Sequence, residues 1–256
     1  MSLHTIDIHT QVAQRLKELR LPGVRACYQQ AAQLAQQESL SYEQYLLELV
    51  EQECEVRRHN RVERYLRKSR LPLEKTLDAL DLKRFPQKVV HQVRTLVEGS
   101  FLDRAENILA FGNPGSGKTH LVCAIGQELI RAGRRVYFTP CSLLVQDLLR
   151  AKHELKLARL LKRLRKYDAL ILDDIGYVQH DRDEMEVLFT LLADRYERGS
   201  VMITSNLPFS QWERIFQDPM TTAAAIDRLV HHSIILELNI SSYRMEQAKR
   251  KEVKVT

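Results

Sequence analysis

The sequence predicts an α/β fold, in which a five-stranded parallel sheet is flanked by helices and preceded by a small all-α domain. From Ser100 onward, short apolar runs of strand length alternate with amphipathic helical segments, which is typical of a parallel sheet between helices. Residues 112–119 fit the phosphate-loop pattern G-x-x-x-x-G-K-T. Before Ser100, glycine is nearly absent and helical spacing dominates. We therefore expect a helical domain over residues 1–98, serving oligomerisation or partner binding, and a phosphate-loop domain over residues 99–256.

The first hundred residues carry helix signals that are interrupted by proline. Apolar residues at helical spacing predict a first helix, which ends at the break Leu21-Pro22-Gly23. Ser41, with Gln44 three residues later, is typical of a capping box that opens a long helix. That helix should end before Leu71-Pro72, and Pro86 marks a further break.

The rest of the chain carries five apolar runs that suit buried parallel strands. One helix is expected directly after the first strand, and others over about residues 143–164 and 185–196. The alternation of strands with helices favours parallel neighbours throughout the sheet. The expected strands are residues 108–111, 136–138, 169–172, 201–204 and 234–238.

The composition is ordinary for a folded protein, because 44% of the 256 residues are hydrophobic and 28% are charged. No apolar run approaches the length of a membrane span, and the first ten residues lack the pattern of a secretory signal. We therefore expect a cytoplasmic protein without membrane contact. The four cysteines form no C-x-x-C pair, so reduced, buried thiols are expected. The net charge of +6 permits a polyanionic partner without requiring one.

The phosphate loop predicts binding of ATP with Mg²⁺. Its glycines let backbone N–H groups turn inward around a phosphate, and the following helix presents its positive end to the same anion. Lys118 should reach the β- and γ-phosphates, and the Thr119 hydroxyl should ligate Mg²⁺. A chance glycine-rich turn is the alternative, but the position between a strand and a helix argues against it. The residues expected to bind the nucleotide are Gly112, Asn113, Pro114, Gly115, Ser116, Gly117, Lys118, Thr119 and His120.

Polar residues follow the third and fourth expected strands. Asp173 and Asp174 end the third strand, where two carboxylates are costly unless a cation lies opposite. We expect Asp173 to face Mg²⁺ and Asp174 to orient or deprotonate the attacking water, although Asp174 could instead only cap the next turn. Asn206 follows the fourth strand and could bind the γ-phosphate or the water. Asparagine before Leu207-Pro208 is also typical of a simple turn.

Together these segments resemble the AAA+ ATPases of the IstB/DnaC group. Two N-terminal segments, Leu21-Pro22-Gly23-Val24-Arg25 and Ser41-Tyr42-Glu43, are similar to those of IstB-like proteins, the transposition helper ATPases of bacterial insertion sequences. The resemblance covers nearly the whole chain and implies a P-loop AAA+ core. The segments that carry it in the second part of the chain are residues 112–119, 170–177, 204–206, 227–229 and 242–244.

The resemblance also implies roles for single residues. Asp173 and Asp174 look like the Walker B pair, Asn206 like sensor 1 and Arg244 like sensor 2, which would bind the nucleotide. Arg228 is similar to the arginine finger that reaches a neighbouring subunit's γ-phosphate, a contact worth about 10³–10⁵ in rate in analogous systems. From the residues alone, a surface ion pair would explain Arg228 equally well.

The sequence departs from the pattern of AAA+ proteins in two ways. Many AAA+ proteins have Glu where this chain has Asp174, and the residues after the last strand are too few for a full C-terminal lid.

Two basic stretches, residues 57–70 and 150–166, could contact DNA phosphates. Each could equally be a solvated helix face, and the first could bridge to a neighbouring subunit or a transposase. The resemblance favours duplex DNA lying along the second stretch in an assembled ring or spiral. The residues expected to contact DNA are Arg150, Lys152, Lys156, Arg159, Lys162 and Arg163.

The motifs and the resemblance together imply an ATP-dependent, DNA-binding regulator of transposition. Such a protein would form a homo-oligomer on double-stranded DNA, engage a partner transposase and hydrolyse ATP with Mg²⁺. A replicative helicase loader of the DnaC type is the alternative, and its ATPase half would look almost the same. A third possibility is a nucleotide-gated assembly protein with negligible turnover, which the short side chain at Asp174 would suit.

Overall fold

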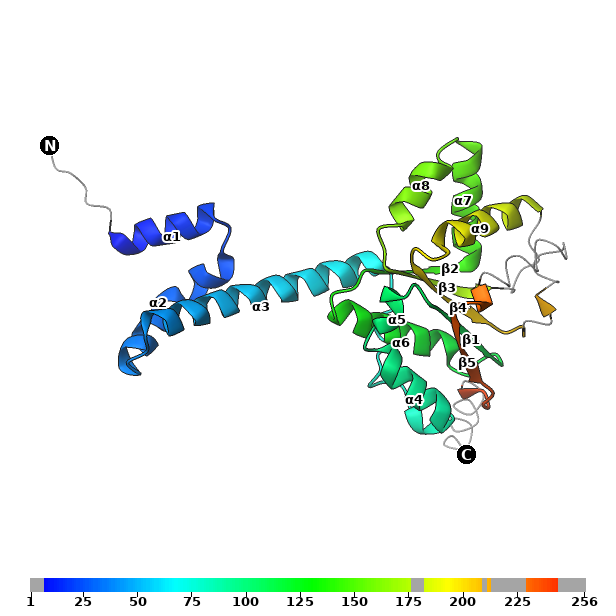
Figure 1. Cartoon of the computed structure of the whole chain (residues 1–256), viewed down its shortest axis with the longest axis horizontal. Helices are drawn as coiled ribbons and strands as arrows, with labels where there is room; N and C mark the ends of the chain where they lie inside the picture. The colour runs from blue at the N-terminus through cyan, green and yellow to red at the C-terminus, as the bar shows by residue number, and fades with distance from the viewer. Residues whose placement is uncertain (1–6, 176–181, 209–210, 213–228, 244–256) are drawn as a thin grey trace, which may run out of the picture. The chain divides into compact units, whose positions relative to one another are not determined.

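The computed structural model describes residues 7–175, 182–208, 211–212 and 229–243 (Figure 1). The chain divides into two compact units, Met1–Arg64 and Tyr65–Thr256. The sequence predicted a boundary after residue 98, whereas the units divide after Arg64. Residues 65–98 belong to the second unit because side chains and carbonyl groups of this segment pack on the helix that follows the phosphate loop.

The described part of the first unit is helical. The predicted break at Leu21 separates the first two helices, and the long helix stops two residues before Leu71, as predicted. The capping box is confirmed: Ser41 Oγ accepts from the Gln44 N–H at 3.2 Å, and Gln44 Oε1 accepts from the Ser41 N–H at 2.9 Å. The helices are α1 (Ile8–Glu18), α2 (Pro22–Gln37) and α3 (Tyr42–Ser69), which continues into the second unit.

A buried carboxylate joins the helices of the first unit. Glu53 is 5% exposed and accepts hydrogen bonds from the N–H groups of Gly23 at 2.7 Å and Val24 at 3.2 Å. These N–H groups open α2 and have no partner within their own helix. Arg57 Nε donates to the same carboxylate at 2.7 Å, and Arg57 Nη2 donates to the Arg20 carbonyl at 3.0 Å. Burial raises the pKa of Glu53, but these hydrogen bonds outweigh it and hold the pKa below its ordinary value.

In the second unit, α3 is followed by a strap, residues 70–81, which packs on α6 (Lys118–Arg131). Leu71 is buried beside Gly126, where any larger side chain would collide with its neighbours. Gln127 Nε2 lies within hydrogen-bond distance of three strap carbonyl oxygens, those of Pro72 (3.2 Å), Leu73 (3.4 Å) and Lys75 (3.0 Å). The strap is followed by η1 (Leu82–Arg84), α4 (Gln87–Leu96) and α5 (Ser100–Asp103).

All five predicted strands are confirmed and form one sheet in the order β2-β3-β4-β1-β5. Every neighbouring pair is parallel, so the carboxyl ends of all strands lie at one edge. The three central strands are buried along most of their length, which explains their continuous apolar sequences. The strands are β1 (Asn107–Gly112), β2 (Val136–Pro140), β3 (Ala169–Ile175), β4 (Ser200–Ser205) and β5 (Ser233–Leu238).

Helices cover both faces of the sheet (Figure 1). On one face, α6 packs across the central strands, and Gly126 makes room for Ile171. On the other, Leu170 and Leu172 point into a core that Trp212 also joins. That face is covered by α7 (Cys141–His153), α8 (Leu157–Leu164) and α9 (Arg182–Arg195). The sequence predicted one helix over residues 143–164. The chain forms two helices because Leu155 has a left-handed φ of 57°, which ends α7.

A buried arginine anchors the end of α8 to the sheet. Arg195 is 3% exposed, and its Nη atoms donate to four backbone carbonyl groups. These belong to Leu164 at the end of α8, to Tyr167 and Asp168 before β3, and to Ser200 at the start of β4. Burial lowers the pKa of Arg195 to about 10.

The cysteines only partly match the prediction of buried thiols. Cys123 and Cys141 are buried, and burial raises the pKa of each to about 12. Cys27 is half-buried and Cys54 is exposed, so the prediction was wrong for Cys54. Among the described residues, no helix has the length and apolar character needed to cross a bilayer.

Replacing Glu53 by Gln should destabilise the helices of the first unit at neutral pH. The carboxylate takes charge-assisted hydrogen bonds worth about 1–3 kcal/mol. Because the folded-state pKa lies below the unfolded value of about 4.3, this stabilisation is present above that pH and is lost as pH falls. Urea unfolding followed by circular dichroism should show a difference between wild type and Glu53→Gln that shrinks toward pH 3. Glu63→Gln, on the exposed side of α3, should change the unfolding curve little. Equal unfolding curves for the wild type and both variants would contradict a stabilising role of the Glu53 carboxylate.

Candidate functional site

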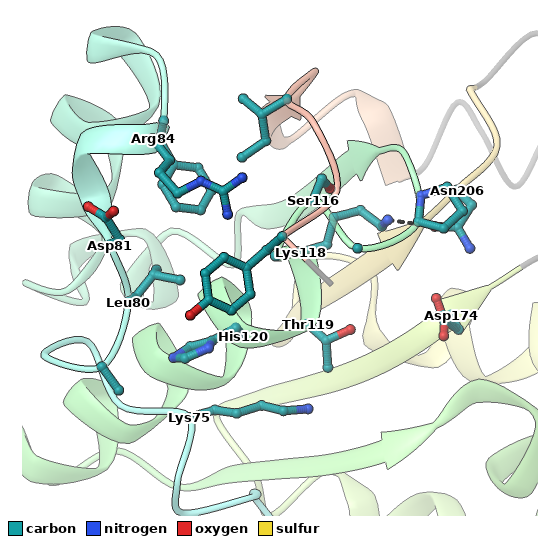
Figure 2. Close-up of a pocket in the computed structure, with 17 residues that line it drawn as sticks. Lys75, Leu80, Asp81, Arg84, Ser116, Lys118, Thr119, His120, Asp174 and Asn206 are labelled. Carbon is teal, nitrogen blue, oxygen red and sulfur yellow. Dashed lines mark hydrogen bonds between the residues drawn. The ribbon is translucent and has the colours of Figure 1, made fainter. Parts of the chain in front are cut away.

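Three loops meet where β1, β3 and β4 end (Figure 2). These strands are neighbours in the sheet, and their register pairs Phe111 with Ser205 and Ser205 with Ile175. The phosphate loop follows β1, the two aspartates end β3, and Asn206 follows β4. Parallel order therefore brings together residues that the sequence predicted as one site although they lie about ninety residues apart by direct count.

The backbone of the phosphate loop requires glycine at two positions. Gly115 has φ 79° and Gly117 has φ 94°, both in the left-handed region. A Cβ atom at Gly115 would lie 2.2 Å from Ser242 Oγ, so that site also lacks space for a side chain. Gly117 is the N-cap of α6, and the loop leads directly into the first turn of that helix. The helix N-terminus and the turned backbone together form a concave anion site.

Lys118 links the loop to the end of β4. Its side chain is 5% exposed, and Nζ donates to the carbonyl groups of Gly112 at 2.8 Å and Asn113 at 3.0 Å. Nζ also donates to Asn206 Oδ1 at 2.5 Å (Figure 2). In the same loop, Ser116 Oγ is buried without a hydrogen-bond partner in the described structure. A phosphate oxygen would satisfy such a hydroxyl, so the cradle fits an anionic ligand.

A chain of hydrogen bonds joins the loop to both aspartates. Asp173 Oδ1 accepts from Thr119 Oγ1 at 2.8 Å and from Thr204 Oγ1 at 2.6 Å. Thr204 Oγ1 in turn accepts from the Asp174 N–H at 2.8 Å. Hydroxyl and carboxylate oxygens are the ligands that Mg²⁺ prefers, so Thr119 and Asp173 suit the predicted metal position.

Thr204 compensates for a bulge at the end of β3. The register shifts between Leu172 and Ile175, and Asp174 has a left-handed φ of 59°. The bulge removes the Asp174 N–H from the strand ladder, and the Thr204 hydroxyl takes its place as partner. Sequence reasoning gave Thr204 no role. A hydroxyl residue that follows three apolar residues, one step inside the end of the strand, is the signal that could have found it.

The candidate site opens into a pocket of about 560 Å³. One end carries the phosphate loop, Asp174 and Asn206 (Figure 2). The pocket is also lined by residues that the sequence did not predict, including Arg84 of η1, whose guanidinium lies 4.9 Å from the centre of the Tyr243 ring. The further lining residues of this kind are Ala79, Leu80, Asp81, Phe85 and Ile240.

His120 and Lys75 form part of the pocket wall near the strap. The predicted ligand His120 does line the pocket, but its Nε2 lies 2.9 Å from the strap carbonyl of Thr76. Lys75 extends beneath Thr119 (Figure 2) and was not predicted. The predicted residues Arg228 and Arg244, like residues 176–177 and Asp227, lie outside the described residues.

The six residues predicted to contact DNA differ in whether they form ion pairs within the described structure. Three of them pair with acids: Arg150 with Asp147 (3.0 Å), Lys152 with Glu186 (2.9 Å) and Lys156 with Glu154 (2.8 Å). Arg159, Lys162 and Arg163 are exposed on α8 and have no ion pair within the described ranges. We call these three residues the basic face of α8.

Comparisons with known proteins agree with this geometry. A family model described as "IstB-like ATP binding protein" matches residues 14–251. A putative insertion sequence ATP-binding protein of Sinorhizobium fredii is 44% identical over 246 residues, which cover 96% of this chain and 82% of that protein. The IS5376 putative ATP-binding protein of Geobacillus stearothermophilus is 37% identical over 236 residues, covering 92% and 94%.

Two solved structures share the fold of this chain. AMPPCP-bound DnaA from Aquifex aeolicus superimposes with a TM-score of 0.57 and 18% identity, over 72% of this chain and 56% of that chain. DnaI superimposes with a TM-score of 0.53 and 22% identity, over 65% of this chain and 89% of that chain.

Replacing Lys118 by Ala should weaken ATP binding about 10- to 100-fold, because a buried charge-assisted contact to phosphate is lost. Titration of a fluorescent ATP analogue at fixed Mg²⁺ would measure the affinity, with the unfolding midpoint as a check on folding. Lys88→Ala, an exposed lysine on α4, is the matched control. An unchanged affinity in Lys118→Ala would exclude the phosphate loop as the nucleotide site.

Proposed function

The chain belongs to the family of IstB-like ATP-binding proteins, and we propose that it is a Mg²⁺-dependent AAA+ ATPase that assembles on duplex DNA and serves a transposase. Its relatives are named as ATP-binding proteins of insertion sequences, which supports a role in transposition. The observation that carries the enzymatic part is the convergence of Lys118, Thr119, Asp173, Asp174 and Asn206 at one sheet edge.

In this proposal the loop amides and Lys118 hold the β- and γ-phosphates of ATP. Thr119 and Asp173 would hold Mg²⁺, which would supply positive charge against the phosphate charge that develops during transfer. Lys118 and Asn206 already contact each other at 2.5 Å, so both can face the γ-phosphate. Leu80, Phe85 and Tyr243 also line the pocket and offer apolar and aromatic surface suited to the nucleoside.

Asp174 is the proposed base. The bulge turns it away from the ladder, and it lines the pocket together with Asn206. A carboxylate in this position could orient a water molecule and accept its proton as the water attacks. The family resemblance adds Arg228 as a finger from a neighbouring subunit and Arg244 as a second sensor. A finger supplied in trans would make hydrolysis depend on assembly into a ring or spiral.

The basic face of α8 is the proposed contact with duplex DNA. Its three cations have no acidic partner in the described part of the chain, so they can bind phosphates without first breaking an ion pair. The cations of α7 would have to leave Asp147 and Glu186 to do so.

Two other functions remain as alternatives. A replicative helicase loader of the DnaC type would use the same nucleotide pocket, but the names of the relatives in sequence favour insertion sequences. A nucleotide-gated assembly protein without turnover would use the same pocket and is separated from an ATPase by the rate of hydrolysis alone.

Replacing Asp174 by Asn should lower the ATPase rate about 100-fold or more while leaving ATP affinity nearly unchanged, because a general base contributes about 10²–10⁴ to rate. The ATPase rate would be measured as phosphate release at saturating ATP, with and without duplex DNA. Asp183→Asn, an exposed residue on α9, should match wild type. Equal and measurable rates for Asp174→Asn and wild type would exclude Asp174 as the base, and a negligible rate in wild type would favour the assembly protein without turnover.

The triple variant Arg159→Ala, Lys162→Ala, Arg163→Ala should weaken duplex binding and reduce its salt dependence. Each lost phosphate contact lowers the slope of log K against log salt by about 0.9. Fluorescence anisotropy with a labelled duplex and a non-hydrolysable ATP analogue, at several salt concentrations, would give the slope. Arg150→Ala, which removes an already paired cation, should change it less. If the triple variant has the same salt slope as wild type, the basic face of α8 does not contact the duplex.

A further inference from the structure

The turn between α7 and α8 presents an unusual side chain to solvent. Leu155 lies in this turn and is 95% exposed. The turn lies at the end of the two helices that is remote from the sheet (Figure 1). A fully exposed leucine gains nothing from packing within the described fold, so its side chain is available to a ligand.

The backbone at this position would favour glycine. The Leu155 N–H donates to the Lys152 carbonyl at 3.0 Å and the Lys156 N–H to the Ala151 carbonyl at 2.7 Å. This is the Schellman pattern of a helix C-terminus, whose left-handed residue is usually glycine. Leu155 occupies that residue with φ 57°. In this conformation the Cβ atom crowds the backbone, and no burial of the leucine side chain offsets the free energy that this crowding costs.

Charged side chains surround Leu155. Lys152 pairs with Glu186, and Lys156 pairs with Glu154, the residue before Leu155. The basic face of α8 begins at Arg159, one helical turn further on. Leu143, an exposed leucine of α7, lies in the first turn of that helix, at its opposite end. The tip is therefore a single exposed apolar side chain between two ion pairs, beside the basic face of α8.

We propose that Leu155 is an apolar wedge that inserts between base pairs of duplex DNA while the basic face of α8 contacts the adjacent phosphates. This inference rests on the DNA binding proposed above. Proteins that bend DNA commonly combine phosphate contacts with an apolar side chain that partly unstacks a base step and kinks the duplex. The side chain of Leu155 is exposed in the free chain, so insertion would not first require it to leave the core.

The test compares Leu155→Gly with wild type, because glycine suits the left-handed turn and removes the wedge. The variant should fold with an equal or higher unfolding midpoint and keep its ATP affinity. It should bind a duplex about tenfold more weakly and bend it less, measured by energy transfer between dyes at the duplex ends. A 2-aminopurine in the duplex should brighten with wild type and stay dim with Leu155→Gly. Leu155→Met, which keeps an apolar side chain, should behave as wild type, as should Leu143→Asn.

The outcomes distinguish this inference from its premise. Suppose that wild type binds the duplex and that Leu155→Gly produces the same bending and the same 2-aminopurine fluorescence. The wedge is then excluded, while the DNA-binding function stands. If wild type with ATP does not bind a duplex at all, both fail together. A lower unfolding midpoint in Leu155→Gly would mean that the leucine stabilises the fold, which also overturns the proposal. Loss of binding to a transposase with unchanged DNA bending would assign the tip to a protein partner instead.

Discussion

One carboxylate oxygen joins the three segments on which the candidate site depends. Asp173 Oδ1 accepts hydrogen bonds from Thr119 in the first turn of α6 and from Thr204 in β4. These contacts require β3, β4 and β1 to be neighbours, with their carboxyl ends at the same edge. A slip of one residue in any of these strands would turn the polar side chains to the other face of the sheet. The strand order and register are therefore conditions for the site as well as features of the fold.

Much of the fold could be predicted because its strands are buried on both faces and carry continuous apolar sequences. The positions of all five strands follow from that signal, and Ser41 with Gln44 marks the start of α3 through local hydrogen bonds alone. The break between α7 and α8 could not be predicted, because a leucine occupies a backbone position whose usual signal is glycine. The division after Arg64 lies within the continuous helix α3, where the sequence gives no change in periodicity.

The phosphate end of the site follows from sequence because its residues lie in motifs whose spacing is fixed by local geometry. The rest of the pocket lining does not follow from the sequence. Arg84 and Tyr243 come from segments far apart in the chain and meet only through tertiary packing. The role of Thr204 could not be predicted from the sequence for a different reason. Its partner is the N–H group freed by the bulge at Asp174, and neither the bulge nor its left-handed φ leaves a signal in the residue types.

The four carbonyl contacts of Arg195 have a mechanical consequence. They anchor the end of α8 to the segments that begin β3 and β4, whereas the phosphate loop and both aspartates lie at the opposite edge of the sheet. The two ends of the α7–α8 hairpin are therefore tied to opposite edges of the sheet. The end of α8 is held at the amino ends of β3 and β4, whereas α7 begins at Cys141, directly after Pro140, the register partner of Asp173. A force applied to the hairpin tip would reach the candidate site through α7 and the amino ends of the strands through α8.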